Sequence, residues 1–173
     1  FGIIFGIGTV VYGVSFLING PLTDRFGGRF SILCGAGGAG IMNLLMGLVS
    51  WSLLQKGFGA SFFAAHFVYV FSFLYALNMY FQSFGAVAIV KVNAPWFHVR
   101  ERGVFGAIFG ILISLGVYFA FDLGAMILDG MGLIWVFFMP AMLLALFWVV
   151  DAALDSAFFG QGTFYDSAFH PSG

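Results

Sequence analysis

The chain has 173 residues, of which 62% are hydrophobic and 8% are charged, whereas a soluble domain is about 45–50% apolar and about 25% charged. Six Lys/Arg and seven Asp/Glu cannot coat a water-soluble core of this size, so the expected solvent and partner is a lipid bilayer. The net charge of -1 gives no electrostatic footprint for nucleic acid, and the single cysteine, Cys34, excludes an intramolecular disulfide or a multi-thiolate metal site.

Five apolar stretches are long enough to cross a bilayer core roughly 30 Å thick, which takes about 20 helical residues. The first stretch begins without a basic leader, so we interpret it as a helix entered partway, with more chain expected upstream. The sequence predicts an all-α, polytopic transmembrane bundle over residues 1–155, followed by a cytoplasmic tail or linker over residues 156–173. The predicted spans are Phe1–Asn19, Phe30–Leu54, Phe62–Val90, Gly103–Leu128 and Leu133–Leu154.

The connections between the spans carry the charges and predict the orientation of the bundle. Successive spans alternate sides, so the first and third connections share a face with the tail. Lys56 stands alone on the opposite face, and cytoplasmic loops are enriched in Lys and Arg. The face predicted to be cytoplasmic therefore carries Arg25, Arg29, Lys91, Arg100 and Arg102.

Polar residues inside apolar spans are costly, and two sets recur at helical spacing. Such groups either line a water-filled cavity or form interhelical hydrogen bonds that hold the bundle together, and both interpretations stay open. Asp122, which follows the second set, is expected near the far interface, where a solvated helix end is favoured over an ion-coupling site. The two sets are Tyr75, Asn78 and Gln82 in the third span, and Ser114, Tyr118 and Asp122 in the fourth.

The segment after the first span, Gly20-Pro21-Leu22-Thr23-Asp24-Arg25-Phe26-Gly27-Gly28-Arg29, resembles the Gly-x-Leu-x-Asp-Arg-x-Gly-Arg-Arg/Lys loop of the major facilitator superfamily. Only Gly28 departs from that pattern. Its glycines are expected to turn the chain, and its charges to form a latch at the wet helix ends, with Arg102 as the expected partner of Asp24. A basic loop that only obeys the orientation rule is the alternative. The predicted latch residues are Gly20, Asp24, Arg25, Gly27, Arg29, Glu101 and Arg102.

Further motifs are similar to the organophosphate:phosphate antiporter branch of that superfamily: Tyr12-Gly13-Val14-Ser15, Tyr80 to Gly85, Trp96-Phe97 with Arg100 to Gly103, and Met139-Pro140-Ala141. The resemblance implies the second to sixth helices of a twelve-helix fold in a bacterial inner (plasma) membrane. A lysine and a histidine that handle the anion in that branch correspond to Phe16 and Ile113 here, which weakens a phosphate-ester assignment. The candidate cavity-lining residues are Tyr12, Tyr75, Asn78, Gln82, Ser114 and Tyr118.

The resemblance implies a secondary active transporter that moves a small solute, with anions among the candidates, by alternating access. The remaining helices of a parent transporter would then be partners of this chain. A truncated, transporter-derived accessory subunit of a larger membrane complex is the alternative. No enzyme motif, cofactor or metal site is indicated.

Overall fold

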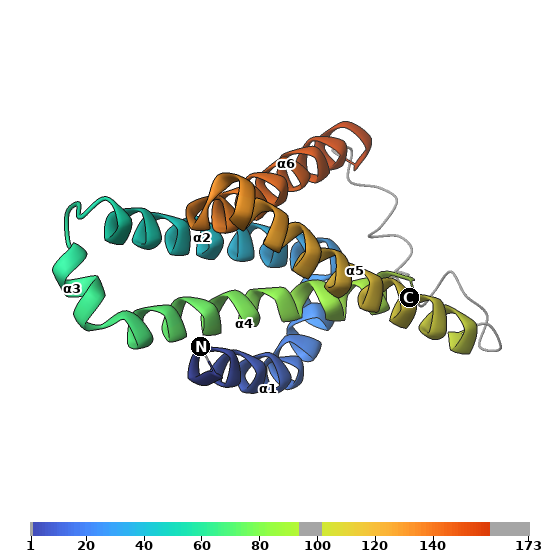
Figure 1. Ribbon diagram of the computed structural model, residues 1–173. Helices are drawn as coiled ribbons and strands as arrows, with labels where there is room; N and C mark the ends of the chain where they lie inside the picture. Colours follow the sequence, from blue (N-terminus) through green and yellow to red (C-terminus); the bar gives the residue numbers. More distant parts are fainter. Residues whose placement is uncertain (1, 94–101, 160–173) are drawn as a thin grey trace.

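The computed structural model describes residues 2–93 and 102–159, which form helices and short turns with no strand in these two ranges. Five of the helices are long and apolar enough to cross a membrane, so the predicted all-α polytopic bundle is confirmed. Figure 1 shows them as long rods lying side by side, with the short α3 joining two of them. The helices are α1 (Gly2–Phe26), α2 (Gly28–Leu54), α3 (Ala60–Ala65), α4 (Phe67–Asn93), α5 (Arg102–Met131) and α6 (Leu133–Phe159).

The first span ends later than the sequence indicated, at Phe26 instead of Asn19. Pro21 lies inside α1 without ending it, and the chain reverses only at Gly27, whose φ of 88° lies in the left-handed region that favours glycine. The expectation that Gly20 takes part in the turn is therefore wrong. Gly20 is a helical residue whose Cβ position faces open space among the described residues.

The third predicted span is two helices, because α3 ends at Ala65 and α4 begins at Phe67. His66, with φ -114° and ψ 22°, caps α3 by donating its backbone N–H to the carbonyl of Phe62 at 3.0 Å. The prediction that one span begins at Phe62 is therefore wrong. The last two helices extend slightly beyond their predicted limits, and α6 includes the first residues assigned to the tail.

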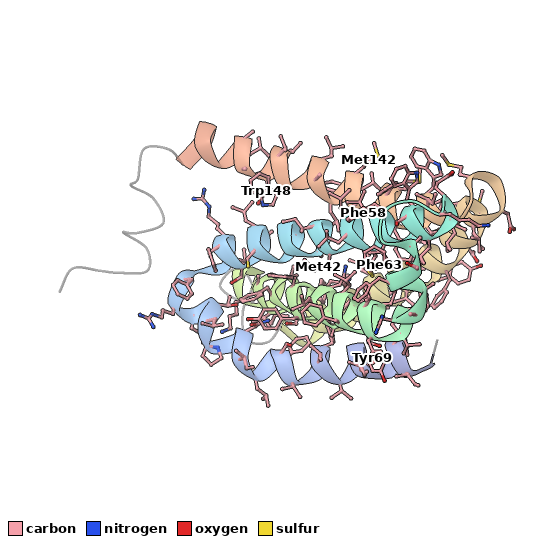
Figure 2. The ribbon with its side chains drawn as sticks, turned by 90° about the vertical axis from the view of Figure 1, so that its left-hand side faces the viewer. Met42, Phe58, Phe63, Tyr69, Met142 and Trp148 are labelled. Carbon is pink, nitrogen blue, oxygen red and sulfur yellow. The ribbon has the colours of Figure 1, made fainter. Side chains whose placement is uncertain are left out.

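Helix α2 is packed between α4 and α6, and glycines on two of its sides set both contacts. A Cβ on Gly35 would lie 3.0 Å from the backbone nitrogen of Gly85 on α4. A Cβ on Gly37 would lie 3.0 Å from the indole Nε1 of Trp148 on α6, and that indole donates a hydrogen bond of 3.1 Å to the carbonyl of Leu33. Figure 2 shows Trp148 between the two helices. Small residues thus allow close helix approach on both sides of α2.

The helices lie in the spatial order α1, α4, α2, α6, and α5 meets α6 near the turn that joins them and then runs away from it (Figure 1). Both α1 and α2 pack extensively on α4 and make little contact with each other. Most described side chains of α5 are exposed, and the Cβ positions of Gly106 and Gly110 have no described atom within 4 Å. The surface of α5 is therefore open to lipid or to further helices.

Candidate functional site

The ends of α1 and α4 are joined by a charged contact, which we call the clasp and define as Asp24, Lys91 and Gly20. The Lys91 ammonium pairs with Asp24 Oδ1 and donates a second hydrogen bond to the carbonyl of Gly20 at 2.6 Å. The Lys91 side chain is 33% exposed and that of Asp24 is 70% exposed. A pair this exposed contributes about 0–1 kcal/mol, so it positions the two helix ends more than it stabilises the fold.

The clasp brings together two connections that are far apart in the sequence. Asp24 immediately precedes the Gly27 turn, and Lys91 stands in the last turn of α4, so both lie at one end of the bundle. The alternation of spans predicted this arrangement. Sequence reasoning placed Lys91 only among the basic residues of the face predicted to be cytoplasmic and named Arg102 as the partner of Asp24. The position of Lys91 at the end of a span, on the same face as Asp24, was the signal that could have predicted this pair.

The other predicted latch residues are described to different extents. Arg25 is exposed, and its guanidinium carbon lies 5.6 Å from the centroid of the Phe26 ring. Arg29 is half-buried at the start of α2 and interacts with another group of the protein. Glu101 and the side chain of Arg102 lie outside the described part of the chain.

A buried polar chain, which sequence reasoning missed, runs beside the clasp. Asn19 is fully buried, and its side-chain nitrogen Nδ2 donates to the hydroxyl of Ser83 at 2.5 Å and to the carbonyl of Tyr80 at 3.2 Å, both on α4. The Thr23 hydroxyl donates to the carbonyl of Asn19 at 2.7 Å, and the Ser31 hydroxyl of α2 donates to Thr23 Oγ1 at 2.9 Å. Polar side chains therefore connect α1, α4 and α2 just inside the Gly27 turn.

A second polar group, which we call the amide chain, consists of Asn43, Asn78 and Gln82. Asn78 is 1% exposed and donates from Nδ2 to Asn43 Oδ1 at 3.0 Å and to the carbonyl of Ala39 at 3.2 Å, both on α2. Gln82, an exposed residue, donates from Nε2 to Asn78 Oδ1. Asn78 therefore lies in the α2–α4 interface and forms interhelical hydrogen bonds, which was one of the two interpretations of the sequence. Of the amide chain, only Gln82 is an exposed residue.

The remaining cavity-lining candidates do not form one site. Tyr75 is half-buried on α4 and stacks on Phe5 of α1, with ring centroids 6.5 Å apart. Tyr12 is half-buried on α1. On α5, Tyr118 is 63% exposed, and the Ser114 hydroxyl donates to the carbonyl of Gly110 in its own helix at 2.9 Å. Among described residues, α4 makes no extensive contact with α5, so these two sets stay apart.

The five apolar spans, the Gly-lined helix contacts and the clasp at one end define an integral, multi-pass α-helical membrane protein, whose all-α bundle resembles the major facilitator superfamily type. The chain resembles the organophosphate:phosphate antiporter branch of that superfamily.

This resemblance rests on sequence similarity to curated membrane proteins. The membrane sensor protein UhpC of Salmonella typhimurium is 29% identical over 107 residues, which cover 62% of this chain and 21% of that protein. The putative glycerol-3-phosphate transporters 3 and 2 of Arabidopsis thaliana are 29% and 30% identical over 143 residues, which cover 81% of this chain and 25% of each transporter. The chain thus spans about a fifth to a quarter of the length of these relatives. No family model and no solved structure matches it.

Proposed function

We propose that this chain supplies helices two to six of a secondary active transporter that moves a small solute by alternating access across a bacterial inner (plasma) membrane. The observation that carries the proposal is the clasp. It lies at the turn whose residues resemble the superfamily loop, in a chain similar to transporters over most of its length. In this mechanism the first helix of the parent protein completes this bundle, and its last six helices form an opposing bundle that rocks against this one.

The clasp and the Gly27 turn would act as a latch at the cytoplasmic end. Asp24 holds α4 through Lys91, while its exposure leaves the carboxylate accessible to a second partner from the opposing bundle. Arg25, Arg29, Glu101 and Arg102 are the other candidate latch residues. Closing the opposing bundle onto these charges would favour one state, and separating them would favour the other.

The solute is small, and an organic phosphate is one candidate, because relatives carry glycerol-3-phosphate transport in their names. Phe16 and Ile113 stand where the resembled branch has cationic residues, and both are exposed apolar side chains. A phosphate group needs Arg, Lys or oriented N–H donors to replace its water. Cationic partners for an anion would then come from helices outside this chain.

A direct test uses the full-length protein that contains this chain, reconstituted in phosphate-loaded vesicles. The proposal expects uptake of radiolabelled inorganic phosphate or glycerol 3-phosphate that depends on the internal phosphate. Saturable binding without exchange would favour a sensor, a second candidate motivated by the two relatives named as membrane sensors. The matches to transporters and sensors do not favour the accessory-subunit alternative. A protein that neither binds nor exchanges these solutes would overturn the proposal for them.

A further inference from the structure

The hydrogen bonds of the amide chain all run in one direction, from Gln82 to Asn78 to Asn43. This direction determines which donor and acceptor groups of Gln82 remain available. Asn78 uses both N–H groups, toward Asn43 Oδ1 and the Ala39 carbonyl, and its Oδ1 accepts from Gln82. Gln82 therefore donates one of its two N–H groups to Asn78. Its carbonyl oxygen Oε1 and its second N–H have no hydrogen-bond partner within residues 2–93 and 102–159.

The exposed end of the chain lies at mid-depth in the bundle. Gln82 is close to the middle of α4, and Asn43 is close to the middle of α2. An uncompensated amide costs several kcal/mol in hydrocarbon, so polar side chains at this depth face a bundle interior or a water-filled cavity. Gln82 is exposed in this chain, so something polar has to cover it in the membrane.

The direction of Gln82 follows from its neighbours on α4. Asn78 faces α2, while Met79 faces α1, where a Cβ on Gly8 would lie 3.1 Å from Met79 Cγ. At about 100° per residue, position 82 falls between these two directions, about 40° from Asn78 and about 60° from Met79. The carboxamide thus points to the seam between α1 and α2, which make little contact with each other.

We propose that Gln82 binds a hydroxyl group of the solute, and that Asn43 and Asn78 are positioning residues that hold its carboxamide with Oε1 outward. This inference rests on the proposed function and deepens it. A hydroxyl donates to Oε1 and accepts from the second N–H, which uses both remaining groups of the amide. Oε1 would repel the oxygens of an anion. The ligand class is therefore the neutral, polyhydroxyl part of a solute, distinct from any phosphate group.

The first experiment tests whether Gln82 faces a solute path. In a cysteine-free background of the full-length protein, Gln82→Cys is compared with Ser83→Cys, whose parent side chain is 0% exposed. A membrane-impermeant maleimide is expected to label the first on the order of ten times faster than the second, as water access differs. Equal, slow labelling would mean that another helix covers Gln82, and would overturn the inference.

With the Gln82 side chain in place, a second cysteine variant one turn along α4, Ala86→Cys, is then labelled with glycerol, sorbitol, glycerol 3-phosphate or sodium sulfate present at equal ionic strength. At least one hydroxylated probe is expected to slow labelling, while sulfate is expected to leave the rate unchanged. An unchanged rate with all three hydroxylated probes would contradict a hydroxyl contact. These outcomes are independent of the exchange assay. Protection without exchange would contradict the proposed transport but support the hydroxyl contact. Exchange without protection would support transport but contradict the hydroxyl contact.

The role of Asn43 is tested with the Gln82 side chain in place. Asn43→Leu removes the acceptor for Asn78, while Asn43→Asp keeps it. The half-saturating concentration of the most protective probe, read from the thermal shift of the purified full-length protein, is expected to rise about 3–10-fold in Asn43→Leu and in Gln82→Leu. Asn43→Asp is expected to restore it to within about 2-fold. Equal affinities in all variants would overturn the positioning role.

Discussion

The close approach of the α2 backbone to the α4 backbone at Gly35 can be tested by comparing Gly35→Ala with Gly85→Ala. A Cβ on Gly35 would lie 3.0 Å from the nitrogen of Gly85 and 3.1 Å from the carbonyl oxygen of Phe81. Both neighbours are backbone atoms of α4 and cannot rotate away. A Cβ on Gly85 meets nothing within 4 Å among the described residues, although this glycine lies in the same contact.

The two variants share their helix-propensity gain of about 0.8–1 kcal/mol, so the difference between them isolates the steric term. Ordinary contact would require the helices to separate by a few tenths of an ångström. The hydrogen bond from Asn78 to the Ala39 carbonyl, one turn along α2 from Gly35, resists this separation. Overpacking typically costs 1–3 kcal/mol. We therefore expect Gly35→Ala to be about 1–3 kcal/mol less stable than Gly85→Ala.

The assay is equilibrium unfolding of the full-length protein in mixed micelles, followed by circular dichroism for the wild type and both variants. Gly85→Ala is expected to match or exceed the wild type, because it gains helix propensity without a clash. Free energies of unfolding that agree within about 0.5 kcal/mol for the two variants would refute the idea that close backbone approach at Gly35 fixes the α2–α4 contact.

Three further predictions concern the charged end and the helix contacts. Asp24→Asn is expected to shift the ratio of inward- and outward-open states by up to about fivefold, because an exposed pair contributes up to about 1 kcal/mol; unchanged labelling of engineered cysteines from both sides would contradict the latch. Trp148→Phe removes the hydrogen bond to the Leu33 carbonyl and should lower the free energy of unfolding by about 0.5–1.5 kcal/mol. A wild-type value would show that ring packing alone holds α6. Asn19→Leu should destabilise the protein by about 0.6–2 kcal/mol, because two bonds to α4 are lost. Ser114→Ala, whose hydroxyl bonds only within its own helix, is the control and should change little.

Composition and span length were sufficient to predict the all-α bundle, because bilayer thickness sets helix length independently of the neighbours. The end of α1 could not be placed in the same way. Gly20 and Pro21 usually break helices, yet α1 continues through both to Phe26, and the Gly20 carbonyl accepts a hydrogen bond from Lys91 of α4. Likewise, no local pattern announces that Phe62 and Phe67 belong to different helices.

The candidate site was predictable only where spacing within one helix determines it. The spacing of Asn78 and Gln82 placed both on one face of α4, but their partner Asn43 lies 35 positions from Asn78 on another helix. The choice of Lys91 as the partner of Asp24 depends on α1 and α4 lying side by side. Asn19 looked like the polar end of a span, and only the helix packing reveals that it is fully buried.

The spatial order of the helices has a consequence for how the chain is made. Although α1 is synthesised before α2, its main neighbour is α4, which emerges only after α2 and α3 are complete. Until then Asn19 has no Ser83 or Tyr80 carbonyl to bond. Within this chain, the Nδ2 group of Asn19 on the newly inserted α1 therefore lacks both of these acceptors until α4 supplies them, so the α1–α4 contact can form only after α2 and α3 have been made.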